Sequence, residues 1–330
     1  MKVSHSIRPG RDSDADGFIA LTWACWSQYS GIRMDVDAEM PEYRALATYY
    51  TDQGGALWAA EEDGSIAGMI AVRPLTDGAW EICRVYVHPS LHGTGLGHRL
   101  LDTAETFAAA AERLVLWSDT RFERAHRFYE KRSFVRKGPI RVVHDISASL
   151  ECQFEKPRNG IEVLDAAAAE SAIPRLSAIL IACVAEGAGV SFLPPLAPET
   201  ARTFWAGTAR DVAAGDKILL AGWVDGILAG TVTLAVRMPQ NQPHRAEVAK
   251  LLVDPAARRS GLARRLMARL EQEALAVGRP HLMLDTRAGD RAEALYRSMG
   301  WNELGIVPGH ALSKDGIFED TVFFWKKIIR

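Results

Sequence analysis

The sequence has few cysteines and no long apolar run, and both shortages limit the kind of protein it encodes. Its four cysteines among 330 residues show no C-x-x-C spacing. A chain of this length does not need a disulfide scaffold, so free thiols in a reducing compartment are expected. No apolar stretch reaches the roughly 20 residues of a membrane span, and the N-terminus has no secretory signal. We therefore expect a cytoplasmic protein without a membrane partner.

An excess of charge of one sign is also lacking. The chain has 39 Lys and Arg against 41 Asp and Glu, a formal net charge of −2. This balance argues against a nucleic-acid-binding surface over the whole molecule, and no nucleic-acid partner is expected. Five histidines are scattered without the spacing of metal ligands, so no metal is predicted: His126, His144, His244, His281 and His310.

The chain does contain one stretch that occurs twice. Residues 253–267 lead from an apolar segment through Pro255 and a basic loop into an amphipathic helix, and the stretch beginning at Val87 matches them without a gap, 166 residues earlier. The same separation relates Glu81 to Glu247. Tyr129 and Tyr296 are 167 residues apart. A repeat near half the chain length predicts two copies of one domain, 1–148 and 161–330, with 149–160 as a polar linker.

The repeated stretch has the chemistry of an anion site. A helix N-terminus offers backbone N–H groups without helical partners, and the helix dipole favours negative charge there. A glycine allows close approach of the backbone, and arginines add charge. We interpret the stretch as a diphosphate cradle; the alternative is a tight strand-to-helix turn with solvated arginines. A dinucleotide fingerprint would need glycine at His98, and the G-K-(S/T) of a P-loop is absent.

The motifs resemble those of a known family. The pattern V-x-P-x-x-(Q/R)-x-x-G-x-(G/A) resembles the acetyl-CoA signature of the GNAT N-acetyltransferases, and a later A-x-x-(L/F)-Y-x-x-x-G-(F/W) is similar to the segment with that family's acid tyrosine. The later motif is Ala292–Trp301 in the second half and Ala125–Phe134 in the first, where Ser133 replaces the glycine. Strands mixed with helices already indicate an α/β or α+β layered fold. The resemblance implies two tandem GNAT domains, each with a mixed sheet whose two central strands splay apart.

The resemblance also implies a cofactor and its contacts. Acetyl-CoA would be the co-substrate, held by two sets of residues. These are Leu251, Leu252, Val253, Arg258, Arg259, Ser260, Gly261, Leu262, Ala263 and Arg264 in the second copy, and Val85, Val87, His92, Gly93, Thr94, Gly95, Leu96 and Gly97 in the first. The first copy departs from the family at His92, where Gln or Arg is usual. Seven residues before each tyrosine the family often has Asn, and here Phe122 and Gly289 stand instead.

Four residues are candidates for proton transfer. By resemblance, Tyr296 and Tyr129 would protonate the leaving thiolate, and Glu247 and Glu81 would take the proton of the amine. The family stabilises the oxyanion with backbone N–H groups at a bulge in this strand, near 251–253. The structural alternatives are tyrosines in the core and glutamates on a solvated strand face.

The expected function is transfer of the acetyl group of acetyl-CoA to a primary amine of a small molecule by direct attack. The second half matches the motifs better and also resembles small-molecule acetyltransferases of the tabtoxin-resistance type, so we expect it to be the more active half. Two alternatives stay open: a CoA-binding protein with one or both halves silent, and an enzyme that acetylates a protein amine. We expect the stretches 28–50 and 187–198 to shape the acceptor pockets. The chain would be a monomer that acts as a pseudo-dimer, or a homodimer.

Overall fold

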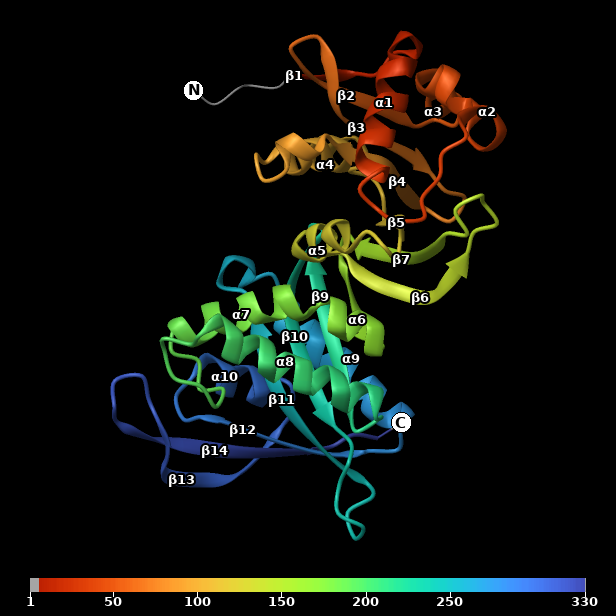
Figure 1. Ribbon diagram of the computed structural model, residues 1–330. Helices are drawn as coiled ribbons and strands as arrows, with labels where there is room; N and C mark the ends of the chain where they lie inside the picture. The colour runs from red at the N-terminus through yellow and green to blue at the C-terminus, as the bar shows by residue number, and fades with distance from the viewer. Residues whose placement is uncertain (1–5, 330) are drawn as a thin grey trace. The chain divides into compact units, whose positions relative to one another are not determined.

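The computed structural model describes residues 6–329 and divides into two compact units (Figure 1). One unit holds the chain up to Arg127 together with Lys137–Pro157. The other holds Phe128–Arg136 and the chain from Arg158 onward. Each unit contains a seven-stranded mixed sheet, and each is described here by itself.

The first sheet has antiparallel neighbours except at its centre, where β4 and β5 run parallel. In spatial order its strands are β1 (Ser6–Pro9), β2 (Ala56–Glu62), β3 (Ser65–Pro74), β4 (Ala79–Val87), β5 (Arg113–Asp119), β7 (Leu150–Pro157) and β6 (Val135–Val142).

The second sheet repeats this topology strand for strand, again with one parallel pair, β11 and β12, at its centre. Its spatial order is β8 (Gly160–Leu164), β9 (Lys217–Val224), β10 (Ile227–Ala235), β11 (Arg245–Val253), β12 (His281–Arg287), β14 (Phe318–Lys327) and β13 (Asn302–Leu312). The duplicated α/β fold inferred from the sequence is thus confirmed.

Helices cover both faces of each sheet. In the first unit, Met69 and Ala71 of β3 pack with one buried cluster under α1 and α3, while α4 packs on the face of Gly68. In the second unit α6, α7 and α8 cover one face and α9 the other. The helices are η1 (Asp12–Asp14), α1 (Ala15–Trp26), α2 (Val36–Glu39), η2 (Pro41–Ala45), α3 (Leu46–Asp52), η3 (Pro89–Leu91), α4 (Leu96–Phe107), α5 (Glu123–Lys131), α6 (Ala166–Ser171), α7 (Ile173–Ala185), α8 (Pro198–Ala213), η4 (Pro255–Ala257), α9 (Leu262–Ala276) and α10 (Arg291–Ser298).

Helix α9 lies close to its sheet because a glycine faces it. A Cβ atom at Gly230 would stand 2.8 Å from Leu262 Cδ2 and 3.0 Å from the backbone oxygen of Leu252. The Leu262 distance is shorter than real Cβ contacts, so a residue larger than glycine would press on the helix at this point. The N-terminus of α9 is the predicted cradle, and this packing therefore fixes the height of the cradle above the sheet.

The two central strands of each sheet pair only at their first residues. Strand β4 pairs with β5 over Ala79–Glu81, and β11 pairs with β12 over Arg245–Glu247; beyond these residues the strands are no longer partners. The register of β4 against β3, and of β11 against β10, shifts just after this point. Arg84 and Lys250 lie at these bulges with φ of 52° and 54°. A bulge bends and twists its strand, so it accompanies the opening of the sheet.

Two Asp-Gly turns close hairpins, and the segment predicted as a linker forms a strand. The two-residue turns Asp63–Gly64 and Asp225–Gly226 have positive φ throughout and join β2 to β3 and β9 to β10, as hairpin signals of this type require. The predicted linker 149–160 is wrong, because residues 150–157 form β7, which pairs with β5 along its length. Cys152 and Phe154 are buried and alternate with polar residues, the pattern of a strand with one face inside.

Candidate active site

Each unit presents a helix whose N-cap is a glycine in the left-handed region. Gly95 precedes α4 with φ of 89°, and Gly261 precedes α9 with φ of 76°. Neither has a side chain to accept from the first-turn N–H groups, and a Cβ built on either would meet nothing within 4 Å. Open space before an uncapped helix N-terminus fits the diphosphate of acetyl-CoA, so the residues present suit that ligand.

The hydroxyl groups of the two loops hold the turn. Thr94 Oγ1 donates to the carbonyl oxygen of Leu91 at 2.8 Å, and Ser260 Oγ donates to that of Ala257 at 2.7 Å. The matching contacts indicate that both loops have one backbone form. The hydroxyl groups of Thr94 and Ser260, predicted as cofactor ligands, thus stabilise the shape of the two loops.

The arginines of the second loop differ in whether another side chain of the protein binds them. Arg258 forms an ion pair with Glu186, and Arg264 donates to Ser298 Oγ at 2.6 Å. Arg259, at φ of 64°, forms no ion pair with any residue between 6 and 329. A non-glycine residue with positive φ has a strained backbone. Because Arg258 is already paired, the guanidinium of Arg259 is the positive charge of this loop that can bind a ligand.

His92 gives the first loop little charge. Its Nε2 lies 3.1 Å from the carbonyl oxygen of Val87. Burial and the neighbouring charge of Arg124 lower the pKa of His92. The imidazole is therefore neutral at pH 7 and donates its Nε2 proton to Val87.

The opened strand edges lie directly before these loops. From Ile82 to Val87, strand β4 is paired with β3 on one side and has no β5 residue opposite on the other. Val85 and Val87 lie on this segment, and Leu251, Leu252 and Val253 lie on the matching segment of β11. Unpaired backbone groups along such an edge suit the amides of the pantetheine arm.

The two candidate tyrosines sit in matching local structures. Tyr296 on α10 is 5 % exposed, and its ring centroid lies 6.0 Å from that of Trp301. Tyr129 on α5 is also 5 % exposed and lies 5.9 Å from Phe134. Burial, followed by the charges of Asp285 and Asp290, raises the pKa of Tyr296 above its usual value, so this hydroxyl holds its proton.

Both candidate glutamates are held by an arginine. Arg73 Nε donates to Glu81 Oε2 at 2.7 Å, and the Glu81 side chain is 14 % exposed. Arg245 Nη2 donates to Glu247 Oε1 at 2.6 Å, and the Glu247 side chain is 54 % exposed. Glu81 therefore faces the interior of its unit, whereas Glu247 lies on a solvated strand face.

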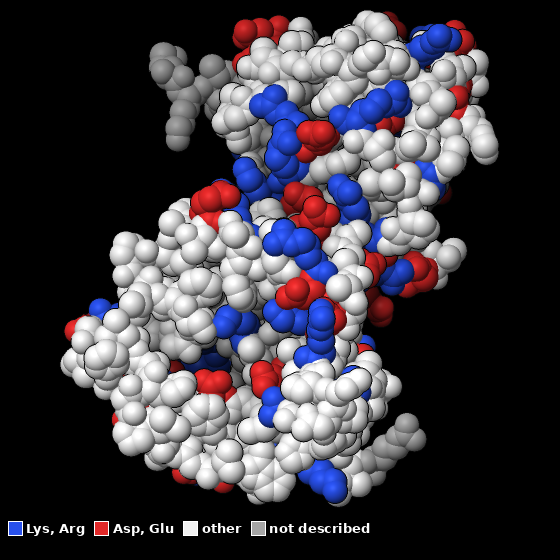
Figure 2. Space-filling view, turned by 60° about the horizontal axis from the view of Figure 1, so that its bottom comes forward, with Lys and Arg blue, Asp and Glu red and all other residues white. Residues whose placement is uncertain are grey.

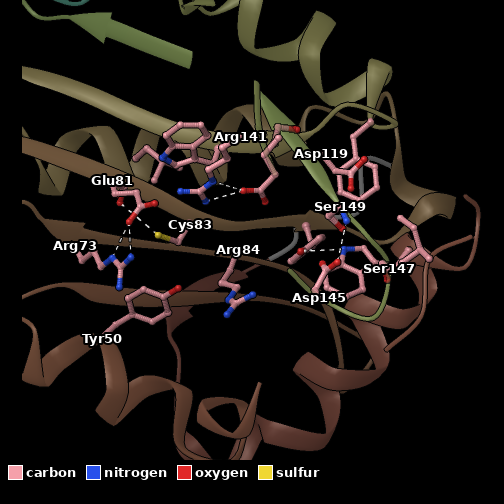
Figure 3. Close-up of a pocket in the computed structure, with 18 of the residues that line it drawn as sticks. Tyr50, Arg73, Glu81, Cys83, Arg84, Asp119, Arg141, Asp145, Ser147 and Ser149 are labelled. Carbon is pink, nitrogen blue, oxygen red and sulfur yellow. Dashed lines mark hydrogen bonds and ion pairs between the residues drawn. The ribbon is translucent and has the colours of Figure 1, made fainter. Parts of the chain in front are cut away.

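A cavity of about 300 Å³ opens beside the bulge of β4 in the first unit (Figure 3). Glu81, Cys83 and Arg84 reach it from β4, and Asp119 from the end of β5. Arg141 stacks over the Trp117 ring at 3.8 Å and pairs with Glu151 at 2.6 Å within this cavity. Ile32, Tyr49 and Tyr50 from the stretch 28–50 also line it.

The second unit has a cavity of about 330 Å³ at a different place. Residues of the stretch 187–194 form one side, with His310, Ser313 and Lys314 opposite. Asp285 of β12 lines it, but no residue of β11 does. Glu247 and Tyr296, the predicted catalytic pair of this half, are therefore not brought together in it.

Comparison with known proteins identifies the family. A family model described as the acetyltransferase (GNAT) family matches residues 17–134 and again 190–301. The chain belongs to the GNAT acetyltransferase family. An uncharacterised N-acetyltransferase from the hisH-hisA intergenic region of Azospirillum brasilense is 36 % identical over 112 residues, 33 % of this chain and 65 % of the relative. One from Mycobacterium bovis is 36 % identical over 103 residues, 30 % of this chain and 64 % of the relative. The match thus spans just under two thirds of these relatives.

Solved GNAT structures resemble half of the chain. A ribosomal-protein-alanine N-acetyltransferase from Brucella melitensis shares 26 % identity, covers 51 % of this chain and 99 % of that one, and gives a TM-score of 0.43. A putative acetyltransferase from Salmonella typhimurium, solved with its cofactor acetyl-CoA, shares 19 % identity over 52 % of this chain and 95 % of that one, with a TM-score of 0.45.

Four residues of the GNAT domains that the sequence motifs did not assign occupy equivalent sites. Asp119 ends β5 and Asp285 lies two residues before the end of β12, and Arg121 and Arg287 follow these aspartates by two residues. Asp119 pairs with Arg121 at 2.5 Å, and both aspartates line a cavity. The signal was present in the sequence, because these pairs keep the 166-residue separation of Glu81 and Glu247.

The surface of this GNAT protein carries no large area of one charge on the face in Figure 2, where basic and acidic side chains are interspersed. Within residues 6–329, the structure contains no helix long and apolar enough to cross a bilayer. The same residues include no group of three His, Cys, Asp or Glu arranged to hold a metal ion. The four cysteines are free.

Proposed function

We propose that this protein transfers the acetyl group of acetyl-CoA to a primary amine of a small molecule by direct attack. The observation that carries the proposal is the same in both halves: a glycine-capped helix follows a bulged strand whose neighbour has separated from it. The first-unit cavity of about 300 Å³ supports a small acceptor, since it lies at the lower end of the range for ligand pockets.

The chain supplies a base in each half and an acid in the second half. A C–N bond forms as the C–S bond of the thioester breaks, the amine loses one proton and the leaving sulfur gains one. Glu81 or Glu247 accepts the amine proton, after release from its arginine. Backbone N–H groups at the bulge stabilise charge on the acetyl oxygen. In the second half Tyr296 protonates the sulfur, and in the first half the leaving thiolate takes its proton from solvent.

Different features support each half as a catalytic domain. The free cation at Arg259 supports cofactor binding in the second half, which the motifs also favour. The cavity that meets β4 at Glu81, Cys83 and Arg84 supports acceptor binding in the first half. We propose that both halves turn over, and that the second binds acetyl-CoA more tightly.

The test replaces each capping glycine in the full chain with aspartate and with asparagine. Aspartate and asparagine have one shape and both tolerate positive φ, so each pair isolates the charge. At about 5 Å and an effective dielectric constant near 20, one carboxylate repels one phosphate charge by about 3 kcal/mol. Gly95→Asp and Gly261→Asp should each remove one acetyl-CoA site in calorimetry, weakening it roughly 100-fold more than the Asn variant.

Turnover is read as thiol release from acetyl-CoA with a panel of primary amines. Each single Asp variant should retain the activity of the other half, and the double variant should have none. Acetyl-CoA binding without thiol release above background would instead support the CoA-binding alternative. Equal affinity of the Asp and Asn variants would refute the placement of the diphosphate.

A further inference from the structure

The bulge of each central strand carries a long cationic side chain in a strained conformation. Arg84 and Lys250 occupy equivalent positions with φ of 52° and 54°. The left-handed region costs a non-glycine residue about 1–2 kcal/mol. Glycine or asparagine would relieve that strain, yet both copies have a basic residue. Two occurrences in one chain indicate that the position has a use for the charge.

The arginines of the first cavity differ in how they are neutralised. Arg73 pairs with Glu81 at 2.6 Å and Arg141 with Glu151 at 2.6 Å, and all four side chains line the cavity. Arg84 lines it too, but no residue drawn in Figure 3 pairs with its guanidinium. Arg84 is thus the arginine of the cavity lining that has no carboxylate partner among the lining residues drawn.

The partner of Arg84 lies outside the cavity lining. Arg84 Nη2 donates to Glu42 on η2 at 2.6 Å, and its Cζ stands 4.8 Å from the centre of the Tyr43 ring. Its buried Nε has no hydrogen-bond partner among the residues that the structure describes. Anchoring of η2 explains the Glu42 contact, but it does not explain the place of Arg84 in the cavity lining. A guanidinium has five N–H donors in a planar fork and readily binds a second carboxylate.

We propose that Arg84 binds a carboxylate group of the acceptor, so that the first domain acetylates an amine that also bears a carboxylate. This inference rests on the proposed acetyl transfer. Glu81 and Arg84 lie three residues apart on β4 and face one cavity (Figure 3). The carboxylate binds at Arg84 while the amine lies toward Glu81, which orients the nucleophile. The acceptor class is therefore that of amino acids and related zwitterions.

Lys250 occupies the equivalent bulge of the second unit but does not line the cavity of that unit. Its Nζ donates to Ser191 Oγ at 3.4 Å, and Ser191 lines the second cavity. Burial lowers the pKa of Lys250, which marks a cation without a full counter-charge. The second domain thus has a cation at the same bulge, which reaches the cavity only through Ser191.

The experiment uses the full chain carrying Gly261→Asp, so that turnover reports the first domain. Acceptors are offered in pairs: an α-amino acid and the amine that lacks only its carboxylate. In the protein that retains Arg84, we expect kcat/KM to be higher for the amino acid than for the plain amine. Arg84→Gln should lower kcat/KM for the amino acid about 10- to 100-fold, the range for hydrogen bonds to charged groups, and change that for the plain amine less than about threefold. Arg84→Lys should restore part of the preference.

Arg44→Gln is the matched control. Arg44 lies on η2 two residues from Glu42, is 56 % exposed and pairs with Asp37 at 3.0 Å, away from the cavity. It should leave both acceptors unaffected. Should Arg84→Gln fail to fold, competition in the Gly261→Asp protein replaces it. Short carboxylic acids without an amine should then inhibit competitively against the plain amine.

The outcomes separate this inference from the proposed function. Equal use of both acceptors, or an equal loss of both in Arg84→Gln, would overturn carboxylate recognition while acetyl transfer stands. Without thiol release from any amine, the proposed function fails. The carboxylate site is then judged by fluorescence of Trp26 and Trp117, which line the cavity, titrated with short carboxylic acids. Saturable quenching that Arg84→Gln abolishes supports the site, and absence of quenching rejects it.

Discussion

Replacement of Gly230 by alanine tests how the second cradle is held against its sheet. The added Cβ would stand 2.8 Å from Leu262 Cδ2, 3.1 Å from Leu266 Cδ1 and 3.0 Å from the backbone oxygen of Leu252. The two leucine side chains can shift, but the Leu252 oxygen belongs to β11 and cannot rotate away. The contacts with Leu262 and Leu266 therefore press α9 away from the sheet, and the contact with the Leu252 oxygen strains the pairing of β10 with β11. Overpacking of this kind costs about 1–3 kcal/mol in the free energy of unfolding.

That cost is measurable by scanning calorimetry. One kcal/mol shifts the melting temperature of a domain of 150–250 residues by about 2–4 °C, so the second unit should melt roughly 3–10 °C lower. The matched control is Gly207→Ala, within α8, where the new Cβ would meet only Arg210 Nη2 at 3.8 Å. Alanine in a helix interior should stabilise by about 0.5–1 kcal/mol.

The displacement should also be visible in function, because the N-terminus of α9 forms the cradle. Gly230→Ala should weaken acetyl-CoA binding to the second half and leave the first half unchanged. A melting temperature at or above that of the unsubstituted protein, with Gly207→Ala behaving as expected, would refute the argument that glycine sets the height of the helix.

Two further predictions concern titrating groups. Tyr296→Phe should lower kcat of the second half about 10- to 100-fold with little change in acetyl-CoA affinity, since a thiol leaving group needs only modest help. Because burial raises the pKa of Tyr296, we expect the rate of the unsubstituted protein not to fall between pH 8 and 10. An unchanged kcat in Tyr296→Phe would remove the acid role. The pKa of His92 is lowered on folding, so below about pH 6.5 the unfolded chain binds a proton that the folded chain refuses, and stability falls as the pH falls. His92→Gln should make urea stability less dependent on pH between 7.5 and 5.5, and an equal dependence in both proteins would contradict this reasoning.

The parts of the fold that depend on local pattern were readable from the sequence. The Asp-Gly dipeptides are typical of the two hairpin turns, and the repeated loop predicted two helices that each begin after a glycine. The linker prediction failed because only Cys152 and Phe154 alternate as buried apolar residues with polar neighbours in this segment, and two such positions give a weak period-two signal. A strand beside the sheet centre gains its stability from partners distant in the chain, which local pattern does not contain.

The candidate site was readable only in part. The cradle glycines follow from their φ requirement, and the tyrosines from their place in a motif. The ion pairs that hold Glu81 and Glu247 could not be predicted from the sequence. Arg73 lies on a different strand from Glu81, and Arg245 is seen to share a face with Glu247 only when β11 is known to begin at Arg245. The bulge cations were hidden for a different reason: nothing local marks Arg84 or Lys250 as residues with positive φ.

The loop position occupied by glycine in one copy and by arginine in the other has a consequence for how the copies diverged. Gly93 and Arg259 have φ of 84° and 64°, so the main chain bends in the same way at both. At this position the first copy has an unstrained glycine without charge. The second copy has a strained backbone and a positively charged side chain. Ligand capture by the second copy should accordingly weaken more steeply as ionic strength rises, because salt screens an exposed charge but leaves amide donors largely unaffected. Two loops with one backbone conformation would then bind the same ligand with different dependence on salt concentration.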